Sequence, residues 1–216
     1  MKKLLSLLLL TGTLFAQVNN VFTLNPSVSS AGMGNVGIAH ADVKNVFHNP
    51  AFAGLNKRHQ EVSYVKWLPN LSDDMGYQSI LYTSDLGWSS EIFYFNYGTQ
   101  VQSDQYGVVL GDFESSSYRV SGGYGFGFND WLVGARLNLY SHNFIDDYSI
   151  DMNYGFDIGA YKEFGNTSLG LVLKDVGGET EFLSQKLNLP MSVGVGVGHK
   201  FGNFTLASDV KFYEDY

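Results

Sequence analysis

The chain of 216 residues has no cysteine, and it contains few positive charges. Without cysteine it can have no disulfide framework, thiolate zinc site, cysteine nucleophile or lipidated N-terminal cysteine. Its 13 Lys and Arg stand against 21 Asp and Glu, for a formal net charge of -8. A nucleic-acid-binding protein needs a basic surface, so the charge argues against nucleic acid as a partner.

Charged residues of both signs are also scarce, at 16% of the chain, while soluble proteins carry about a quarter. Glycine and aromatic residues are abundant instead, with 25 glycines and 15% Phe, Trp and Tyr. Outer-membrane β-barrels have this composition, because their strands turn aromatic side chains toward lipid. Beyond the first residues no stretch of about 18 apolar residues exists, so the sequence predicts no helical membrane span.

The first sixteen residues read as a secretory signal peptide. A basic start, Met1-Lys2-Lys3, precedes the leucine-rich run Leu4–Leu10, and Thr11–Ala16 ends in a small residue suited to cleavage. The apolar run is too short to cross a bilayer as a helix. An anchored N-terminal helix is the alternative interpretation.

From residue 118 onward the sequence alternates in runs with a period of two, as β-strands do, and three earlier runs between 59 and 98 are rich in Tyr, Phe and Val but alternate less cleanly. Between Met191 and Phe201, for example, the apolar residues Val193, Val195 and Val197 alternate with glycine. We predict nine strands, several of them 10–12 residues long, as a tilted transmembrane strand requires. Their ranges are 59–68, 74–84, 87–98, 118–128, 131–140, 150–162, 167–173, 191–201 and 204–212.

Short and long connections alternate between these strands. The short turns lie near 85–87, 127–130, 164–166 and 201–203, and aromatic residues flank them. The longer connections span roughly 69–73, 99–115, 142–148 and 175–188. Outer-membrane barrels combine short periplasmic turns, long external loops and aromatic girdles in this way. The predicted fold class is therefore all-β, an antiparallel transmembrane β-barrel, with a secreted β-sandwich as the alternative.

Residues 25–55 resemble the start of the PorV/PorQ family of outer-membrane proteins, which are relatives of the FadL-type fatty-acid channels. The matching pieces are Ser30-Ala31-Gly32-Met33-Gly34, Ala39, Asp42, Asn49-Pro50-Ala51 and Gly54-Leu55. The resemblance implies a FadL-like barrel over 59–216 with an inward-folded hatch over 17–58. It also implies a role in type IX secretion, with secretion-system proteins and secreted cargo as partners.

A physical reason for the hatch can be given from its residues. Pro50 fixes its own φ angle and keeps Asn49 out of the helical region, so that the Asn49 side chain can bond nearby backbone. The small residues Ala31, Gly32 and Gly34 would let the backbone lie close to a barrel wall. A plain turn before the first strand is the alternative.

Nine strands present a counting problem, because single-chain bacterial barrels have an even number. An open edge in lipid would leave many backbone groups without partners, each at a cost of several kcal/mol. We therefore expect the chain to be truncated. A small barrel of eight or ten strands and an odd-numbered barrel are the other interpretations.

The sequence contains little that points to catalysis or metal binding. The five histidines lack zinc-site spacing, no Gly-x-Ser-x-Gly elbow exists, and the adjacency of Ser141 and His142 does not by itself give hydrogen-bond geometry. Asp146 and Asp147 belong to an acidic loop without EF-hand spacing. We predict no catalytic residue, metal or cofactor. Four charged residues on the inward faces are expected to form a polar network inside the barrel: Arg119, Arg136, Asp151 and Asp157.

Two functions remain open from the sequence. The first is a non-enzymatic outer-membrane barrel of the PorV/PorQ type, which serves protein secretion or surface attachment of cargo and lies in outer-membrane lipid. The second is a FadL-like channel for small hydrophobic molecules. The predicted inward faces are polar or small, which favours the first.

Overall fold

A computed structural model describes residues 21–69, 74–145, 148–177, 179–182, 185–188 and 191–213. The signal-peptide prediction for residues 1–16 and the acidic loop residues Asp146 and Asp147 lie outside the described residues. Among the described residues, no helix is long and apolar enough to cross a membrane.

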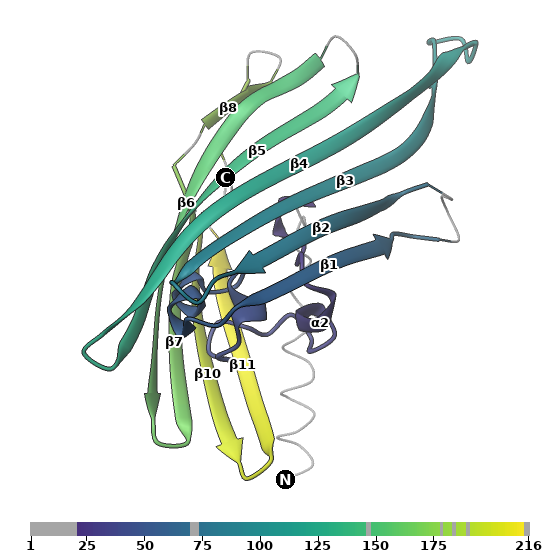
Figure 1. The fold of residues 1–216 in the computed structure, drawn as a ribbon. Coiled ribbons are helices and arrows are strands. Elements are labelled where there is room, and N and C mark those ends of the chain that lie inside the picture. Colours follow the sequence, from purple (N-terminus) through teal and green to yellow (C-terminus); the bar gives the residue numbers. More distant parts are fainter. Residues whose placement is uncertain are drawn as a thin grey trace, which may run out of the picture.

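The chain is all-β, with one large antiparallel sheet of nine strands in the order β1-β2-β3-β4-β5-β6-β7-β10-β11 (Figure 1). Each strand pairs with the next in sequence, apart from the small β8–β9 hairpin inserted after β7. The nine predicted strands are therefore confirmed. Their bounds are β1 His59–Lys66, β2 Gly76–Thr83, β3 Trp88–Ser103, β4 Val109–Phe128, β5 Trp131–Ile145, β6 Tyr148–Phe164, β7 Thr167–Val176, β10 Ser192–Phe201 and β11 Phe204–Tyr213.

Several connections predicted as loops are strand instead. Most of the predicted connection 99–115 belongs to β3 and β4, and most of 142–148 belongs to β5 and β6. The connection 175–188 contains the hairpin of β8 (Glu179–Phe182) and β9 (Gln185–Asn188). In 99–114 the ribbon is exposed on both faces, so its strands need no apolar alternation and the sequence pattern did not mark them.

The tight turns follow the residue chemistry that the sequence predicts. Gly165 and Gly202, in the two Phe-Gly-Asn turns, have φ angles of 61° and 59°. Asn129 and Asp130, between β4 and β5, have φ angles of 46° and 64°. Positive φ at these positions matches the twist of the flanking strands and allows two-residue turns.

The two faces of the sheet differ sharply in polarity. Val193 and Val197 on β10 are exposed, while Gly194 and Gly196 between them are buried. On β6, Met152, Phe156 and Ile158 are exposed, whereas Asp157 is only 1% exposed. The predicted facing is confirmed for these alternating runs of β6 and β10, whose apolar side chains point outward and whose glycines or polar residues point to the face that is covered. On β2 and β3 the covered face is apolar as well, with Leu81, Phe93 and Phe95 buried on it.

That covered face, here called the concave face, holds the N-terminal segment of residues 21–58 (Figure 1). The segment contains four short helical turns: η2 (Val21–Thr23), α2 (Val28–Ala31), η3 (Val43–Asn45) and η4 (Pro50–Leu55). Its residues Val46, Phe52 and Ala53 form an apolar cluster with Leu81 of β2 and Tyr161 of β6. The protein's core therefore lies between this segment and the sheet.

The strand pairs of the described residues do not close into a ring. β1 and β11 are the two edges of the sheet, and no pairing joins them there. The N-terminal segment touches both edges, through Glu61 on β1 and Asp209 on β11. It thus spans the opening between the two edge strands.

Candidate functional site

The N-terminal segment is mostly irregular, so its backbone carbonyl groups need partners other than a helix or sheet. Inward side chains of the strands supply them. Arg119 on β4 donates to the carbonyl oxygens of Phe22 and Leu24, and Lys174 on β7 donates to the Phe47 carbonyl at 3.0 Å. The polar character of the concave face is therefore explained by the protein's own backbone.

Further strands contribute in the same way. Tyr77 on β2 donates to the Asn25 carbonyl at 3.2 Å, and Thr83 on the same strand donates to the Lys57 carbonyl at 2.8 Å. Ser168 on β7 donates to the Ala39 carbonyl at 2.8 Å. Side chains from opposite parts of the sheet thus fix one path of the segment across the concave face.

Glycines on the concave face let the segment's backbone approach the strands directly. A methyl group built at Gly125 of β4 would lie 2.5 Å from the Gly54 nitrogen and 3.0 Å from the Pro50 oxygen. At Gly134 of β5 it would overlap the Pro50 carbonyl, and at Gly170 of β7 the Ile38 carbonyl. These glycines have a packing role, because any side chain there would push the segment away.

Asn49 occupies the centre of this contact and is completely buried. Its Nδ2 donates to the Ile38 carbonyl at 2.9 Å and to the Ala160 carbonyl of β6 at 3.1 Å, while its Oδ1 accepts from the Ala51 nitrogen. Pro50 follows as the first residue of η4, and Asn49 is extended, with φ -144° and ψ 109°. The side chain therefore caps η4 and ties it to the sheet.

A buried charge cluster lies beside this contact. Glu91 of β3 is 2% exposed and accepts from Nε and Nη2 of Arg119 at 2.8 and 2.6 Å. Its other oxygen accepts from Arg136 of β5. One carboxylate thus bridges two guanidinium groups from two other strands, which a buried pair requires to offset the cost of removing charge from water.

The ring of Phe47 lies among the cations of this cluster. The Lys174 ammonium is 3.9 Å from the ring centroid, the Arg119 guanidinium carbon 4.5 Å and the Arg136 guanidinium carbon 5.6 Å. Cations attract the face of an aromatic ring, and more strongly when water is excluded. Phe47 therefore fastens the N-terminal segment to β4, β5 and β7 together.

The next residue, His48, is held neutral. Its Nε2 lies 3.0 Å from Nδ2 of Asn25, which can only donate, so Nε2 accepts and carries no proton. Burial, followed by the positive charges of Lys211, Lys174 and Arg136, holds the pKa of His48 well below its usual value. A proton on this ring would add a further cation to a region already rich in them.

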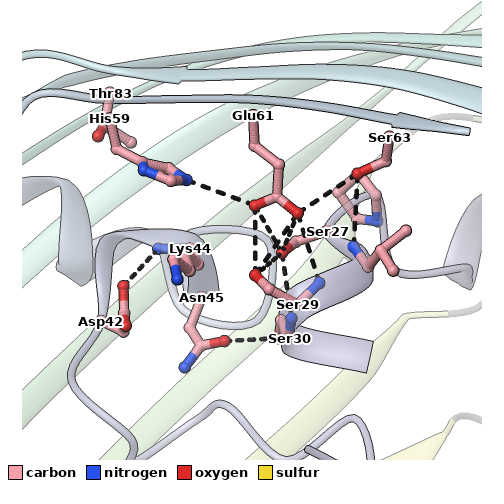
Figure 2. Close-up of polar contacts among 12 residues, drawn as sticks. Ser27, Ser29, Ser30, Asp42, Lys44, Asn45, His59, Glu61, Ser63 and Thr83 are labelled. Carbon is pink, nitrogen blue, oxygen red and sulfur yellow. Dashed lines mark hydrogen bonds and ion pairs between the residues drawn. The ribbon is translucent and has the colours of Figure 1, made fainter. Parts of the chain in front are cut away.

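At one edge of the sheet, Glu61 of β1 holds the turn that contains α2 (Figure 2). Its carboxylate accepts from the Ser27 hydroxyl at 3.0 and 2.9 Å and lies near the Ser29 backbone and hydroxyl groups. His59 lies on another side of the carboxylate, at 3.4 Å. The serines donate to a carboxylate rather than to a histidine base, so the group fastens α2 to β1 and lacks the order of a nucleophilic triad.

At the other edge of the sheet, Asp209 of β11 binds a different part of the N-terminal segment. Its Oδ2 accepts from the backbone nitrogens of Gly37 and Ile38, at 2.7 and 2.9 Å. One carboxylate on each edge strand therefore fastens a different part of the N-terminal segment.

The residues predicted for the hatch divide into two groups. Asn49, Pro50, Ala51 and Gly54 are buried against β4, β5 and β6. In contrast, Gly32, Met33 and Gly34 are exposed in the turn after α2, and Ala31 is half-buried. A methyl group at Gly34 would meet nothing within 4 Å, so the expected close approach of Gly32 and Gly34 to a wall is wrong. The close approach is made by Ile38 and Ala39 instead.

The four charged residues predicted for the inner network are also only partly joined. Arg119 and Arg136 meet through Glu91, which the sequence analysis did not single out. Asp157 faces Arg136 in the strand register, but its Oδ1 accepts from the Asp175 backbone nitrogen. The side chain of Asp151 lies outside the described part of the structure. Glu91 could have been found as the lone acid in an aromatic run, at an inward position of the alternation.

One serine–histidine contact joins neighbouring strands on the concave face. His142 of β5 is hydrogen-bonded to Ser117 of β4, not to its sequence neighbour Ser141, and the Tyr97 hydroxyl lies 3.1 Å from the Ser117 hydroxyl. Ser117 is completely buried, so no substrate reaches its hydroxyl in this arrangement. Within the described ranges, no group of three or more His, Cys, Asp or Glu side chains is placed to hold a metal ion.

Neither a protein-family model nor a curated protein matches the sequence.

Proposed function

We propose that this protein is a non-enzymatic, outer-membrane β-barrel protein of the PorV/PorQ type, which serves type IX protein secretion or the surface attachment of cargo. The observation that carries the proposal is the polarity of the two sheet faces. Apolar side chains are exposed and charged side chains are buried, which is the reverse of the usual arrangement in a soluble protein. Ile158 and Phe156 are about half exposed on the outer face, while Arg119, Glu91 and Asp157 are nearly inaccessible on the concave face. Contiguous exposed apolar surface of this kind needs lipid or protein to cover it.

The N-terminal segment lies on the concave face, and this supports a role other than the passage of small molecules. Side chains of β2, β4, β5, β7 and β11 bond the backbone of the N-terminal segment, and glycines bring that backbone against the sheet. A channel for small hydrophobic molecules would need an open apolar path. On this face the apolar residues Phe93 and Phe95 pack with Val21 and Leu24 of the N-terminal segment. Most other buried side chains of the face are Ser, Arg, Glu, Asp and Lys. We therefore favour an anchor or adaptor in secretion over a FadL-like channel.

Membrane residence is tested by expressing the full chain and fractionating the cells. The expected result is recovery with the outer membrane and extraction by detergent but not by high salt. A chain that stays monomeric in buffer without detergent would contradict the proposal, because its outer face would then be stable in water.

The secretion role is tested by deleting the gene and measuring two processes. We expect surface display of secreted proteins to fall and uptake of long-chain fatty acids to stay unchanged, with the wild-type gene restoring display. The reverse pattern would favour the channel. If neither process changed, both proposed roles would be contradicted.

A further inference from the structure

β3 and β4 continue well beyond the strands beside them. The pairing of β2 with β3 ends at Gly76 and Asn96, and the pairing of β4 with β5 starts at Ser116 and Asn143. Residues 99–114 therefore form a two-stranded ribbon that protrudes from the sheet (Figure 1, upper right). A two-stranded ribbon alone is of marginal stability in water, which makes this part of the chain suited to a partner.

The ribbon has one open edge. On the β3 side, Asp74 covers the edge by accepting from the Thr99 nitrogen and hydroxyl, at 2.8 and 2.7 Å. On the β4 side, no strand of the described ranges pairs with Val109–Glu114. Every second residue of such an edge points its N–H and C=O outward, where another extended chain can pair with them.

The ribbon is also apolar at its surface. Five large apolar side chains of the ribbon are between 57% and 82% exposed. They are Val101, Tyr106, Val108, Val109 and Leu110. In soluble proteins, residues such as Val and Leu are most often buried. A strand added at the β4 edge would cover part of this surface.

The charge of the ribbon indicates the chemistry of its partner. No Lys or Arg occurs between Lys66 and Arg119, while the ribbon contains Asp104, Asp112 and Glu114. A hollow of about 310 Å³ lies on the ribbon, lined by Thr99, Asp112, Phe113 and Glu114. Two carboxylates suit an ammonium or guanidinium group. A second copy of this acidic ribbon would be repelled.

We propose that the β4 edge from Val109 to Glu114 binds an extended, basic segment of a partner protein as an additional strand, with a Lys or Arg side chain in the hollow. Main-chain hydrogen bonds would supply the affinity of such strand addition, and the hollow its preference for a cation. This inference goes beyond the proposed function and does not depend on membrane insertion.

The test uses the full chain, refolded in detergent, and a fluorescent octapeptide in which Lys alternates with Val and Thr. We expect saturable binding by fluorescence anisotropy, and binding at least about tenfold weaker for the peptide with Glu in place of Lys. Two further peptides carry N-methyl groups on alternate residues, in the two complementary registers. They should bind unequally, because each leaves the opposite edge of the peptide free, and for a given strand direction only one of these edges pairs with β4 while Lys faces the hollow.

The matched variants separate the ribbon from other acidic sites. Asp112→Asn with Glu114→Gln should weaken binding about tenfold, while Asp130→Asn, in the β4–β5 turn, should leave it unchanged. Equal binding of both N-methylated peptides would show charge attraction without strand pairing and overturn the proposal. Absence of binding, or concentration-dependent self-association through the ribbon in sedimentation, would overturn it as well.

Discussion

Glu91 is the buried carboxylate that bridges Arg119 and Arg136 on the concave face. Glu91→Gln would leave two buried guanidinium groups without their carboxylate, and we expect the free energy of unfolding to fall by about 3–5 kcal/mol. Urea unfolding in detergent micelles, followed by tryptophan fluorescence, measures the change. Asp85→Asn is the control, because its pair with Arg58 is exposed and contributes about 1 kcal/mol or less. Similar losses in both variants would contradict the bridging role.

His48 is expected to make the stability of the protein depend on pH. Its pKa is lowered in the folded protein, so the unfolded chain binds the proton more readily, and stability falls as the pH drops below the unfolded value of about 6.5. The loss from this one group is at most about 1.4 kcal/mol per pH unit, and it vanishes above neutral pH. His48→Gln removes the titration. The difference in unfolding free energy between wild type and variant should therefore depend on pH below 6.5, and a constant difference would refute the assignment.

At the scale of the element, Gly125 and Gly122 of β4 lie on opposite faces of the strand. Gly125→Ala would press a methyl group against the Gly54 and Pro50 backbone, and we expect a loss of about 1–3 kcal/mol. Gly122→Ala points outward, meets nothing within 4 Å, and should cost little or nothing.

Limited proteolysis gives the second measurement for this pair. If the methyl group displaces the N-terminal segment, trypsin should cut after Lys57 or Arg58 faster in the Gly125→Ala variant than in the Gly122→Ala variant. Equal rates and equal stabilities would mean that the segment does not depend on contact with β4.

For the whole molecule, the central question is what covers the outer face. Ile158 of β6 is 58% exposed there, and Ile158→Arg should cost about 2–4 kcal/mol if the face touches the middle of a bilayer. Tyr106→Arg, at the tip of the ribbon, should cost almost nothing. Folding in lipid vesicles at increasing urea concentration measures both. If Ile158→Arg folds as well as wild type, the outer face is in contact with water or protein rather than lipid.

The sequence by itself determined the strands and their two faces. The alternation of Val193, Gly194, Val195 and Gly196 is a local property, because successive side chains of a strand point to opposite sides wherever the strand lies. The positive-φ turns at Gly165 and Gly202 were equally predictable from two residues. The capping role of Asn49 before Pro50 is local too.

Only the tertiary structure decided what the inward side chains contact. The bridge from Glu91 to Arg119 and Arg136 depends on the register of three strands, and the hold of Asp209 on Gly37 joins residues more than 170 positions apart in the chain. The length of the β3–β4 ribbon was hidden because both of its faces are exposed and no alternation marks them. Periodicity reports the environment of one strand, whereas partners across the sheet follow from how the whole chain packs.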